Sequence, residues 1–312
     1  MGFVKLNLYG KTKTPCLFLS DFTGENCEVY PLDSLKQNNI AYAIDANHTY
    51  TQHKYFLEKK AVDFHEYAAK FNTVIENIKA GNTYILNLTQ PTAIDTNLSL
   101  EAIYKHANAH YKLRYKDQFV CFSPEPFIRI EDNTIATFPM KGTIDASLPN
   151  AKEKILANEK EMAEHVMIVD LLRNDLSIVA KDVKVERFRY TQKIAAGDKE
   201  LLQVSSHISG KLASNWQEHL GDILKALLPA GSISGAPKKS TVDLIQKIEG
   251  CDRGFFSGVF GVFDGKRVES GVMIRFIEKT AQGYLYKSGG GITLDSDARS
   301  EYEEMIDKVY LP

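Results

Sequence analysis

The strongest constraint on the fold is the order in which strand-like and helix-like segments follow one another along the 312 residues. Near the carboxyl end, the strand-like runs FFSGVFGVF, RVESGVMIRFIEK and GYLYKSGGGITL alternate with turns before a closing helix, SEYEEMIDKVY. Strands and helices are interleaved without a regular β-α-β repeat, and this order favours an α+β fold with antiparallel sheets. Because no segment is rich in Pro, Gly or Ser, we expect one domain.

Earlier segments have clear local patterns. Residues 15–30 are expected to form a hairpin around a Thr-Gly-Glu-Asn turn. Residues 64–80 have apolar positions at helical spacing, end at Gly81-Asn82, and precede the strand-like TYILNLTQ. The runs QFVCF, PFIRI and TIATFPM within residues 117–145 are typical of a β-meander.

The clearest helix signal lies at residues 151–180, where apolar residues recur every three or four positions. This stripe is formed by Leu156, Met162, Val166, Val169 and Leu172. Strands are expected near 182–190 and 201–212, followed by a helix that begins around Trp216. Pro237 suits the first position of the next helix, KKSTVDLIQKIEG.

Charge and cysteine usage exclude several classes of protein. The formal net charge is −2 and the isoelectric point is near 6.5, so no basic field is available for nucleic acid or an anionic membrane. No stretch approaches the ~20 apolar residues of a transmembrane helix. The four cysteines include no C-x-x-C pair, which suggests neither a zinc site nor a disulfide framework. We expect a soluble protein in the reducing cytoplasm.

Two pairs of glutamates are candidate metal ligands, because residues three apart share one face of a helix. Glu161 and Glu164 lie within the expected helix 151–180, and Glu301 and Glu304 lie in the closing helix. Carboxylates and water are the ligands that Mg²⁺ takes in proteins. Solvated carboxylates are common on helix surfaces, so a charged solvent face is the alternative interpretation.

Glycine-rich turns could contact an anionic ligand through their backbone. They lie at residues 231–235 (GSISG) and at Gly289, Gly290 and Gly291, where backbone N–H groups can approach a ligand closely. Neither turn matches a nucleotide-binding motif. Turn geometry alone explains such glycines equally well.

Two cations stand in apolar surroundings. Lys141 follows an apolar run in FPMKGT, and partial desolvation would lower the pKa of its amine and make it a nucleophile. A lysine that points to water is the simpler interpretation. Arg275 lies within the apolar VMIRF, where an arginine usually has an anionic partner, either a ligand or a protein carboxylate. The residues indicate an α+β enzyme with an anionic ligand and leave its substrate unnamed.

Five blocks of sequence, taken together, resemble the chorismate-binding enzymes from about residue 64 to the carboxyl end. The blocks are FSPEPFIRI (122–130), FPMKGTI (138–144), EMAEHVMIVDLLRNDL (161–176), LPAGSISGAPKKSTVDLIQKIE (228–249) and SGGGITLDSDARSEYEEMIDKV (288–309). The resemblance implies two orthogonally packed antiparallel β-sheets flanked by helices. It also implies a single chorismate-binding catalytic domain over residues 1–312 with a shortened amino-terminal region.

The same resemblance implies roles for individual residues. Glu164 and Glu304 would hold Mg²⁺ with support from Glu161 and Glu301, and the ion would bind the ring carboxylate of chorismate. Glu125 would be the general acid for the departing C4 hydroxyl, which requires a pKa raised by burial. The implied substrate-binding residues are Arg275, Lys308, Gly289, Gly290, Gly291, Ser232 and Thr143.

Lys141 resembles the lysine that marks the aminodeoxychorismate synthase branch of this family. There the amine is expected to add at C2 as the C4 hydroxyl leaves, and ammonia then enters at C4 and expels the lysine. Isochorismate and salicylate synthases have a water-activating lysine near the position of Ile85. The resemblance therefore implies amination of chorismate to 4-amino-4-deoxychorismate for 4-aminobenzoate and folate biosynthesis.

No cysteine lies in a Gly-x-Cys-x-Gly turn, so the resemblance implies that ammonia comes from a glutamine amidotransferase subunit or from free ammonium. The alternatives are anthranilate synthase component I and a degenerate subunit that only binds and regulates an amidotransferase. The sequence departs from the family pattern at Gln203, Phe256 and Ser232, where histidine, tyrosine and threonine are usual, and His207 lies near the first of them. These departures leave open how the enolpyruvyl side would bind.

Overall fold

The computed structural model describes residues 1–45, 54–196 and 199–311 of the chain, which divides into two compact units. Each unit is assembled from segments that are far apart in the sequence. The first unit draws on residues 1–15, 126–227 and 262–270, and the second draws on residues 16–125, 228–261 and 271–312. The expected α+β class with two antiparallel sheets is confirmed, and the action of both units as one catalytic domain stays a prediction.

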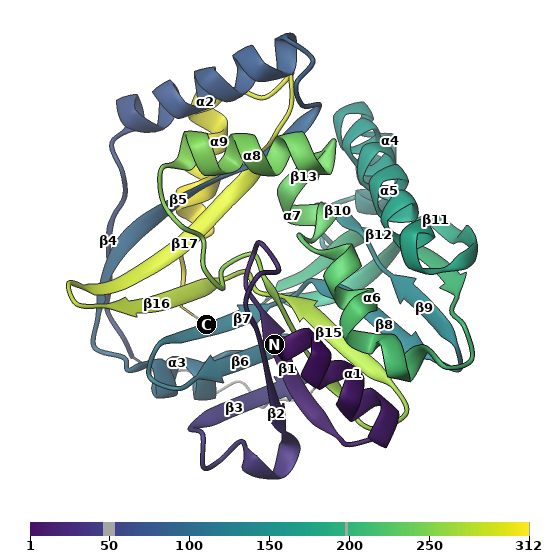
Figure 1. The fold of residues 1–312 in the computed structure, drawn as a ribbon. Helices are drawn as coiled ribbons and strands as arrows, with labels where there is room; N and C mark the ends of the chain where they lie inside the picture. The colour runs from purple at the N-terminus through teal and green to yellow at the C-terminus, as the bar shows by residue number, and fades with distance from the viewer. Residues whose placement is uncertain (46–53, 197–198, 312) are drawn as a thin grey trace. The chain divides into compact units, whose positions relative to one another are not determined.

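A long strand, β12, organises the first unit. The strands of this unit include β8 (Pro126–Glu131), β9 (Thr134–Thr137), β10 (Met140–Asp145), β11 (Lys181–Ala196) and β12 (Lys199–Lys211). One edge of β12 pairs with β11, and the other edge pairs with β9 and β10, all antiparallel. The helices are α1 (Gly2–Thr12), α4 (Ala151–Ala157), α5 (Glu159–Val179), η2 (Trp216–His219) and α6 (Leu220–Leu227). Figure 1 shows α4 and α5 alongside β10 and β12.

The β-meander expected over residues 117–145 is wrong in its pairing. β8 and β9 form the expected hairpin, but β9 does not continue into one strand up to Met140. The first run forms β7 (Phe119–Ser123), which pairs with β6 (Tyr111–Tyr115) and β16 (Phe276–Thr280) in the other sheet and not with β8. The last run is interrupted at Phe138-Pro139, and β9 and β10 each pair with β12. Their partner lies far along the sequence, so local turn signals could not identify it.

The helix expected over residues 151–180 is broken at Asn158, whose extended backbone separates α4 from α5. The Asn158 side chain accepts the N–H of Glu161 at 3.0 Å. Asparagine is among the preferred N-cap residues because its side-chain oxygen satisfies an otherwise unpaired helical N–H. A cap of this kind starts a new helix within a continuous apolar pattern.

The buried face of α5 differs from the expected apolar stripe. Met162 and Val166 are exposed, which corrects that expectation. Among the α5 residues whose burial is described, the buried ones are His165, Ile168, Val169, Leu172, Asp175 and Leu176. Periodicity groups residues onto a helix face, but packing against the sheet decides which face is covered.

An eight-stranded antiparallel sheet is central to the second unit, in the order β13-β5-β17-β16-β7-β6-β3 with β4 also paired to β5. These strands are β3 (Ile40–Ile44), β4 (Leu57–Lys60), β5 (Ile85–Thr96), β6 (Tyr111–Tyr115), β7 (Phe119–Ser123), β13 (Gly235–Ala236), β16 (Phe276–Thr280) and β17 (Gly283–Ile292). The helices are η1 (Leu32–Ser34), α2 (Phe64–Lys79), α3 (Leu100–His106), α7 (Gly231–Ser234), α8 (Lys238–Glu249) and α9 (Ala298–Asp307).

The helices α2, α8 and α9 cover β5 and β17, as Figure 1 shows. Tyr67 and Phe71 of α2, Leu86 and Leu88 of β5, and Met305 of α9 are buried in one apolar cluster. This cluster holds the helices against the strands through the hydrophobic effect. No helix in the described part of the chain is long and apolar enough to cross a membrane.

Local expectations for the rest of the chain are met with two corrections. The hairpin at 15–30 is confirmed as β1 (Cys16–Ser20) paired with β2 (Cys27–Pro31). The strand expected over 267–279 is divided into β15 (Val268–Val272) and β16 after β14 (Val259–Phe263). Pro237 is the N-cap of α8 rather than its first helical residue, a shift of one position that is common at helix ends.

Candidate active site

Lys141 lies at an irregular point of the first unit's sheet. The pairing of β10 with β12 shifts register between Met140 and Thr143. Within this bulge Gly142 has a φ of 85°, a backbone region that favours glycine. Bulges bend a strand and redirect its side chains, and they are frequent beside active sites. The bulge therefore gives Lys141 a direction that a regular strand would not.

Two glutamates of α5 lie next to this bulge. Lys141 Nζ is 4.0 Å from Glu164 Oε2, and the two side chains are 24% and 15% exposed. A Cβ placed on Gly142 would lie 3.2 Å from Glu161 Oε2, so this carboxylate also approaches the bulge closely. Three residues expected at the site thus lie together in the first unit. Thr143, expected to contact substrate, is exposed on the same strand.

His165 is a residue of this region that the sequence interpretation missed. It is fully buried, and its Nε2 lies 2.7 Å from Ser206 Oγ on β12. Burial, with the nearby charges of Arg189 and Lys141, lowers the pKa of His165 to about 4, so the ring is neutral at pH 7. The bond ties α5, which carries Glu164, to the strand that pairs with β10. In the sequence, the position of His165 directly after Glu164 was the signal that could have indicated a role for this histidine at the candidate site.

The glycine-rich end of β17 lies against β5 in the second unit. A Cβ on Gly289 would lie 2.3 Å from the Leu88 carbonyl oxygen, so this position requires glycine. A Cβ on Gly290 would instead meet Glu301 Oε2 at 3.1 Å and Lys308 Nζ at 3.7 Å. Both are ends of flexible side chains. Gly290 therefore faces the charged groups of α9, as a ligand-binding strand could.

α9 and its C-cap residue Lys308 carry three expected site residues, of which Glu301 and Lys308 lie near these glycines. Glu301 is buried, and its Oε1 accepts a hydrogen bond from Ser296 Oγ at 2.8 Å. Lys308 Nζ donates to the Gly289 carbonyl oxygen at 2.9 Å and lies 2.7 Å from Glu304 Oε1. The candidate residues of the second unit therefore combine two carboxylates, one ammonium group and the glycine-rich strand.

Arg275 does not lie within a strand, which corrects the sequence interpretation. It sits between β15 and β16 with a φ of 51°, and its carbonyl oxygen accepts the N–H of Phe122 at 3.2 Å. Its Nε is 3.4 Å from the Tyr310 hydroxyl, and its guanidinium lies 5.7 Å from the centre of that ring. An aromatic face stabilises this cation through its negative quadrupole.

The remaining expected residues are placed by short local structures. Ser232 lies half-buried in α7, in the turn that leads to α8. Glu125 is half-buried between β7 and β8, where its N–H donates to Ser123 Oγ at 3.1 Å. The Glu125 carbonyl oxygen accepts the N–H of Val272 at 3.0 Å. These backbone bonds fix where the Glu125 side chain begins.

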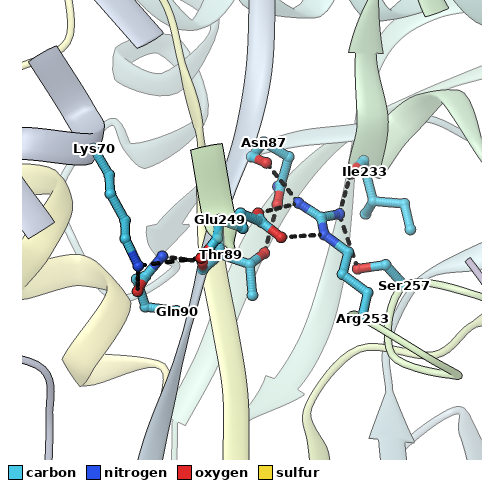
Figure 2. A network of polar contacts seen from close by, with 8 residues as sticks. All are labelled: Lys70, Asn87, Thr89, Gln90, Ile233, Glu249, Arg253 and Ser257. Atoms are coloured by element: carbon cyan, nitrogen blue, oxygen red, sulfur yellow. Dashed lines mark hydrogen bonds and ion pairs between the residues drawn. The ribbon is translucent and has the colours of Figure 1, made fainter. Parts of the chain in front are cut away.

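A buried polar network next to the expected binding segments of the second unit was also missed from the sequence. Figure 2 shows Glu249, the last residue of α8, paired with Arg253, with Thr89 of β5 bonded to the same carboxylate. Lys70 of α2 extends the network through Gln90 at 2.9 Å. The spacing of Glu249 and Arg253 was visible in KIEGCDR, but this spacing is usually found in exposed helical ion pairs.

The carboxylates of the candidate site have the donor chemistry that Mg²⁺ prefers. Glu161 and Glu164 belong to the first unit, and Glu301 and Glu304 belong to the second. Over the residues the structure describes, no group of three or more His, Cys, Asp or Glu is arranged to hold a metal ion. Each pair supplies two carboxylates within its own unit, and a magnesium site that combines the pairs stays a prediction.

Comparison with known proteins gives these residues a family context. Residues 21–311 match the family described as "chorismate binding enzyme". A protein of Haemophilus influenzae named "Uncharacterized PabA-like protein" is 50% identical over 310 residues, which cover 98% of this chain and 94% of that protein.

Named synthases are more distant. Aminodeoxychorismate synthase component 1 of Salmonella typhimurium is 34% identical over 78% of this chain, and anthranilate synthase component 1 of Archaeoglobus fulgidus is 33% identical over 75%. These matches span 56% and 58% of the two synthases. In the crystal structure of anthranilate synthase component I from Streptococcus pneumoniae, 58% of the chain aligns with 81% of this one, with a TM-score of 0.68 and 25% identity.

Proposed function

Because this chain belongs to the chorismate-binding enzyme family, we propose that it aminates chorismate to 4-amino-4-deoxychorismate for 4-aminobenzoate and folate biosynthesis. One observation carries the proposal: Lys141 lies on a β-bulge with its amine 4.0 Å from Glu164. A lysine on a strand that a bulge redirects can present its amine to a bound ligand, and a lysine amine is one of the side-chain nucleophiles that enzymes use. The resemblance assigns a lysine here to the branch that aminates C4.

The reaction in this proposal uses two residues on the reacting atoms. The unprotonated Lys141 amine adds to C2 while the C4 hydroxyl leaves as water, with its proton supplied by Glu125. Ammonia then adds at C4 with its own lone pair, the ring double bonds shift back toward C2, and Lys141 leaves as an amine with the electron pair of the C2–N bond. The proton that the entering nitrogen loses returns to Glu125. The net change is the replacement of hydroxyl by amine at C4, so no oxidant or reductant is consumed.

The remaining charged residues bind the substrate in this proposal. Arg275 and Lys308, with the N–H groups of the glycine-rich strand, take one carboxylate of chorismate. Mg²⁺ held by Glu164 and Glu304, with Glu161 and Glu301 in support, would supply positive charge for the ring carboxylate. Two clamps on a dianionic substrate fix its orientation, which lowers the entropic part of the barrier.

Ammonia in this proposal comes from a glutamine amidotransferase subunit, and the cytoplasm is the setting in which we place the reaction. A separate source of ammonia is supported by the sequence, which has no Gly-x-Cys-x-Gly turn and therefore no evident glutaminase nucleophile. Free ammonium at high concentration replaces the subunit in an assay.

Anthranilate synthesis is the second candidate. The Archaeoglobus anthranilate synthase and the Salmonella aminodeoxychorismate synthase are equally similar to this chain, at 33% and 34% identity. Overall similarity therefore does not separate the two reactions. Lys141 favours amination at C4, since the corresponding motif of anthranilate synthases generally carries alanine.

Identification of the product decides between the candidates. The purified chain is incubated with chorismate, Mg²⁺ and ammonium, and the products are identified by mass spectrometry. We expect 4-amino-4-deoxychorismate, which yields 4-aminobenzoate only after a lyase is added. Fluorescent anthranilate formed without a lyase would replace this proposal with the second candidate. Failure to consume chorismate would indicate a non-catalytic subunit.

A further inference from the structure

A buried ion pair in the second unit touches two segments that the proposed function assigns to the substrate. The side chains of Glu249 and Arg253 are 0% and 1% exposed. Arg253 Nε donates to Glu249 Oε2 at 2.9 Å, and Arg253 Nη2 donates to Glu249 Oε1 at 2.6 Å. Two parallel charge-assisted bonds of this kind fix the guanidinium plane.

The fixed guanidinium also holds two distant backbone segments. Arg253 Nη1 donates to the carbonyl oxygen of Ile233 at 3.1 Å, one residue after Ser232 in α7. Arg253 Nη2 donates to the carbonyl oxygen of Asn87 on β5 at 2.7 Å. Figure 2 shows the guanidinium with Asn87 and Glu249 on one side and Ile233 on the other.

The carboxylate holds β5 a second time. Glu249 Oε1 accepts the N–H of Thr89 at 2.8 Å. Asn87 and Thr89 are the residues of β5 that lie opposite Gly291 and Gly289 of β17. The ion pair is therefore bonded to the strand that supports the glycine-rich edge and to the turn that carries Ser232.

We propose that the Glu249–Arg253 ion pair is a positioning element that sets the Ser232 turn relative to the Gly289–Gly291 edge and thereby the affinity for chorismate. The inference rests on the proposed function, which places both segments against the substrate. Neither side chain acts on the reacting atoms. A displacement of about 1 Å in a substrate-positioning group can lower kcat/KM about 100-fold, so such an element has a measurable effect.

Arginine suits this task for a physical reason. Its guanidinium has five N–H donors in a rigid fork, and Arg253 directs them to a carboxylate, two carbonyl oxygens from separate segments and the Ser257 hydroxyl at 3.3 Å. A buried ion pair can often be replaced by apolar side chains without loss of stability. Its effect on geometry can therefore be separated from its effect on stability.

The double variant Glu249→Leu/Arg253→Met makes that separation. Removal of Arg253 alone leaves a buried carboxylate unpaired and is expected to destabilise the protein strongly. The double variant has no unpaired charge, so we expect its melting temperature to lie well above that of the single Arg253 variant. It should stay below that of the unaltered protein, because backbone groups of Asn87, Thr89 and Ile233 lose their partners. The kcat/KM of the double variant for chorismate should remain about 100-fold lower, mainly through KM. Chorismate affinity is measured separately by calorimetry with Mg²⁺ and without ammonium.

Arg253→Lys is a second variant that retains the charge but not the fork. A lysine is a point charge and does not reproduce bidentate geometry, so we expect weakened chorismate binding from a folded protein. Recovery of both melting temperature and affinity in the double variant would show that the pair only stabilises the fold. Unaltered affinity in folded Arg253→Lys would overturn the proposal as well.

Lys112→Met is the matched control within the same unit. Lys112 is a cation with 1% exposure whose Nζ donates to the carbonyl oxygens of Ala107 and Tyr104, at 2.7 and 3.3 Å, at the end of α3. We expect a lower melting temperature with unchanged chorismate affinity. A parallel loss of affinity in this control would mean that general destabilisation explains the Arg253 result, and the proposal would fail.

The outcomes for this inference and for the proposed function are separate. Anthranilate as the product of the unaltered protein would overturn the proposed function and leave the positioning result unaffected, because chorismate is the substrate in both reactions. Equal chorismate binding by the folded ion-pair variants would overturn the positioning role and leave the product unchanged.

Discussion

Replacement of Lys141 tests the proposed chemistry most directly. Lys141→Ala removes the amine that is expected to attack the ring, whereas Lys141→Arg keeps a positive charge beside Glu164 but supplies a poor nucleophile. Both variants should lose formation of 4-amino-4-deoxychorismate. If charge alone mattered, Lys141→Arg would keep most of the activity.

The structure indicates that the loss should not come from unfolding. Lys141 Nζ and Glu164 Oε2 are 4.0 Å apart, at the outer limit of an ion pair, with 24% and 15% of the side chains exposed. A pair of this kind contributes about 1 kcal/mol or less once solvent and side-chain entropy are included, which corresponds to a shift in melting temperature of about 2–4 °C. Loss of a side chain that acts on the reacting atoms lowers the rate at least ~100-fold, or about 2.7 kcal/mol of activation free energy.

The assay follows amination of chorismate with saturating ammonium and Mg²⁺, with chorismate affinity measured separately. We expect affinity to stay within a few-fold of the unaltered protein, because a nucleophile acts chiefly in the transition state. Lys193→Ala is the control, since Lys193 forms an exposed ion pair with Glu200 at 2.7 Å in the same unit. Undiminished turnover by Lys141→Ala would mean that ammonia attacks directly and would refute the covalent step.

Three further predictions concern a metal ligand, the glycine-rich strand and a histidine of the two units. Glu304→Gln should weaken activation by Mg²⁺, and an unchanged Mg²⁺ titration of activity would remove this residue from the metal site. Gly289→Ala, whose methyl would lie 2.3 Å from the Leu88 carbonyl oxygen, should lower the free energy of unfolding in urea by about 1–3 kcal/mol. Gly290→Ala should spare stability and weaken chorismate binding, and the opposite ranking in these two measurements would contradict the assignment. Burial lowers the pKa of His207, so its neutral form stabilises the fold above pH 6.5 and that contribution is lost as the pH falls below 6.5. The free energy of unfolding should therefore fall more between pH 7 and 5 than in His207→Gln, and equal slopes would exclude this effect.

Sequence patterns identified most helices and strands, because local periodicity and caps act within a few residues. The hairpin at 15–30, α2 and the strands β11 and β12 are examples. The family and the expected residues Lys141 and Glu164 were also accessible from the sequence, since motif spacing along the chain carries this information. The proximity of Lys141 and Glu164 in space could not be read from the sequence.

The tertiary structure decided three features of the candidate site. The bulge that redirects Lys141 is a mismatch in register with β12, a strand that lies about sixty residues later in the chain. His165 sits in an apolar pattern, and only packing against β12 shows that it is buried and bonded to Ser206.

The third feature is the burial of the Glu249–Arg253 ion pair, which sequence patterns could not predict. The four-residue spacing of the two side chains is equally suited to a solvent-exposed pair. Only the tertiary structure shows that this pair is buried, with backbone groups of the distant segments β5 and α7 as its partners. Local sequence therefore determined which residues could bear charge, and the long-range fold decided which charges were withdrawn from water, because desolvation depends on every segment packed around a group.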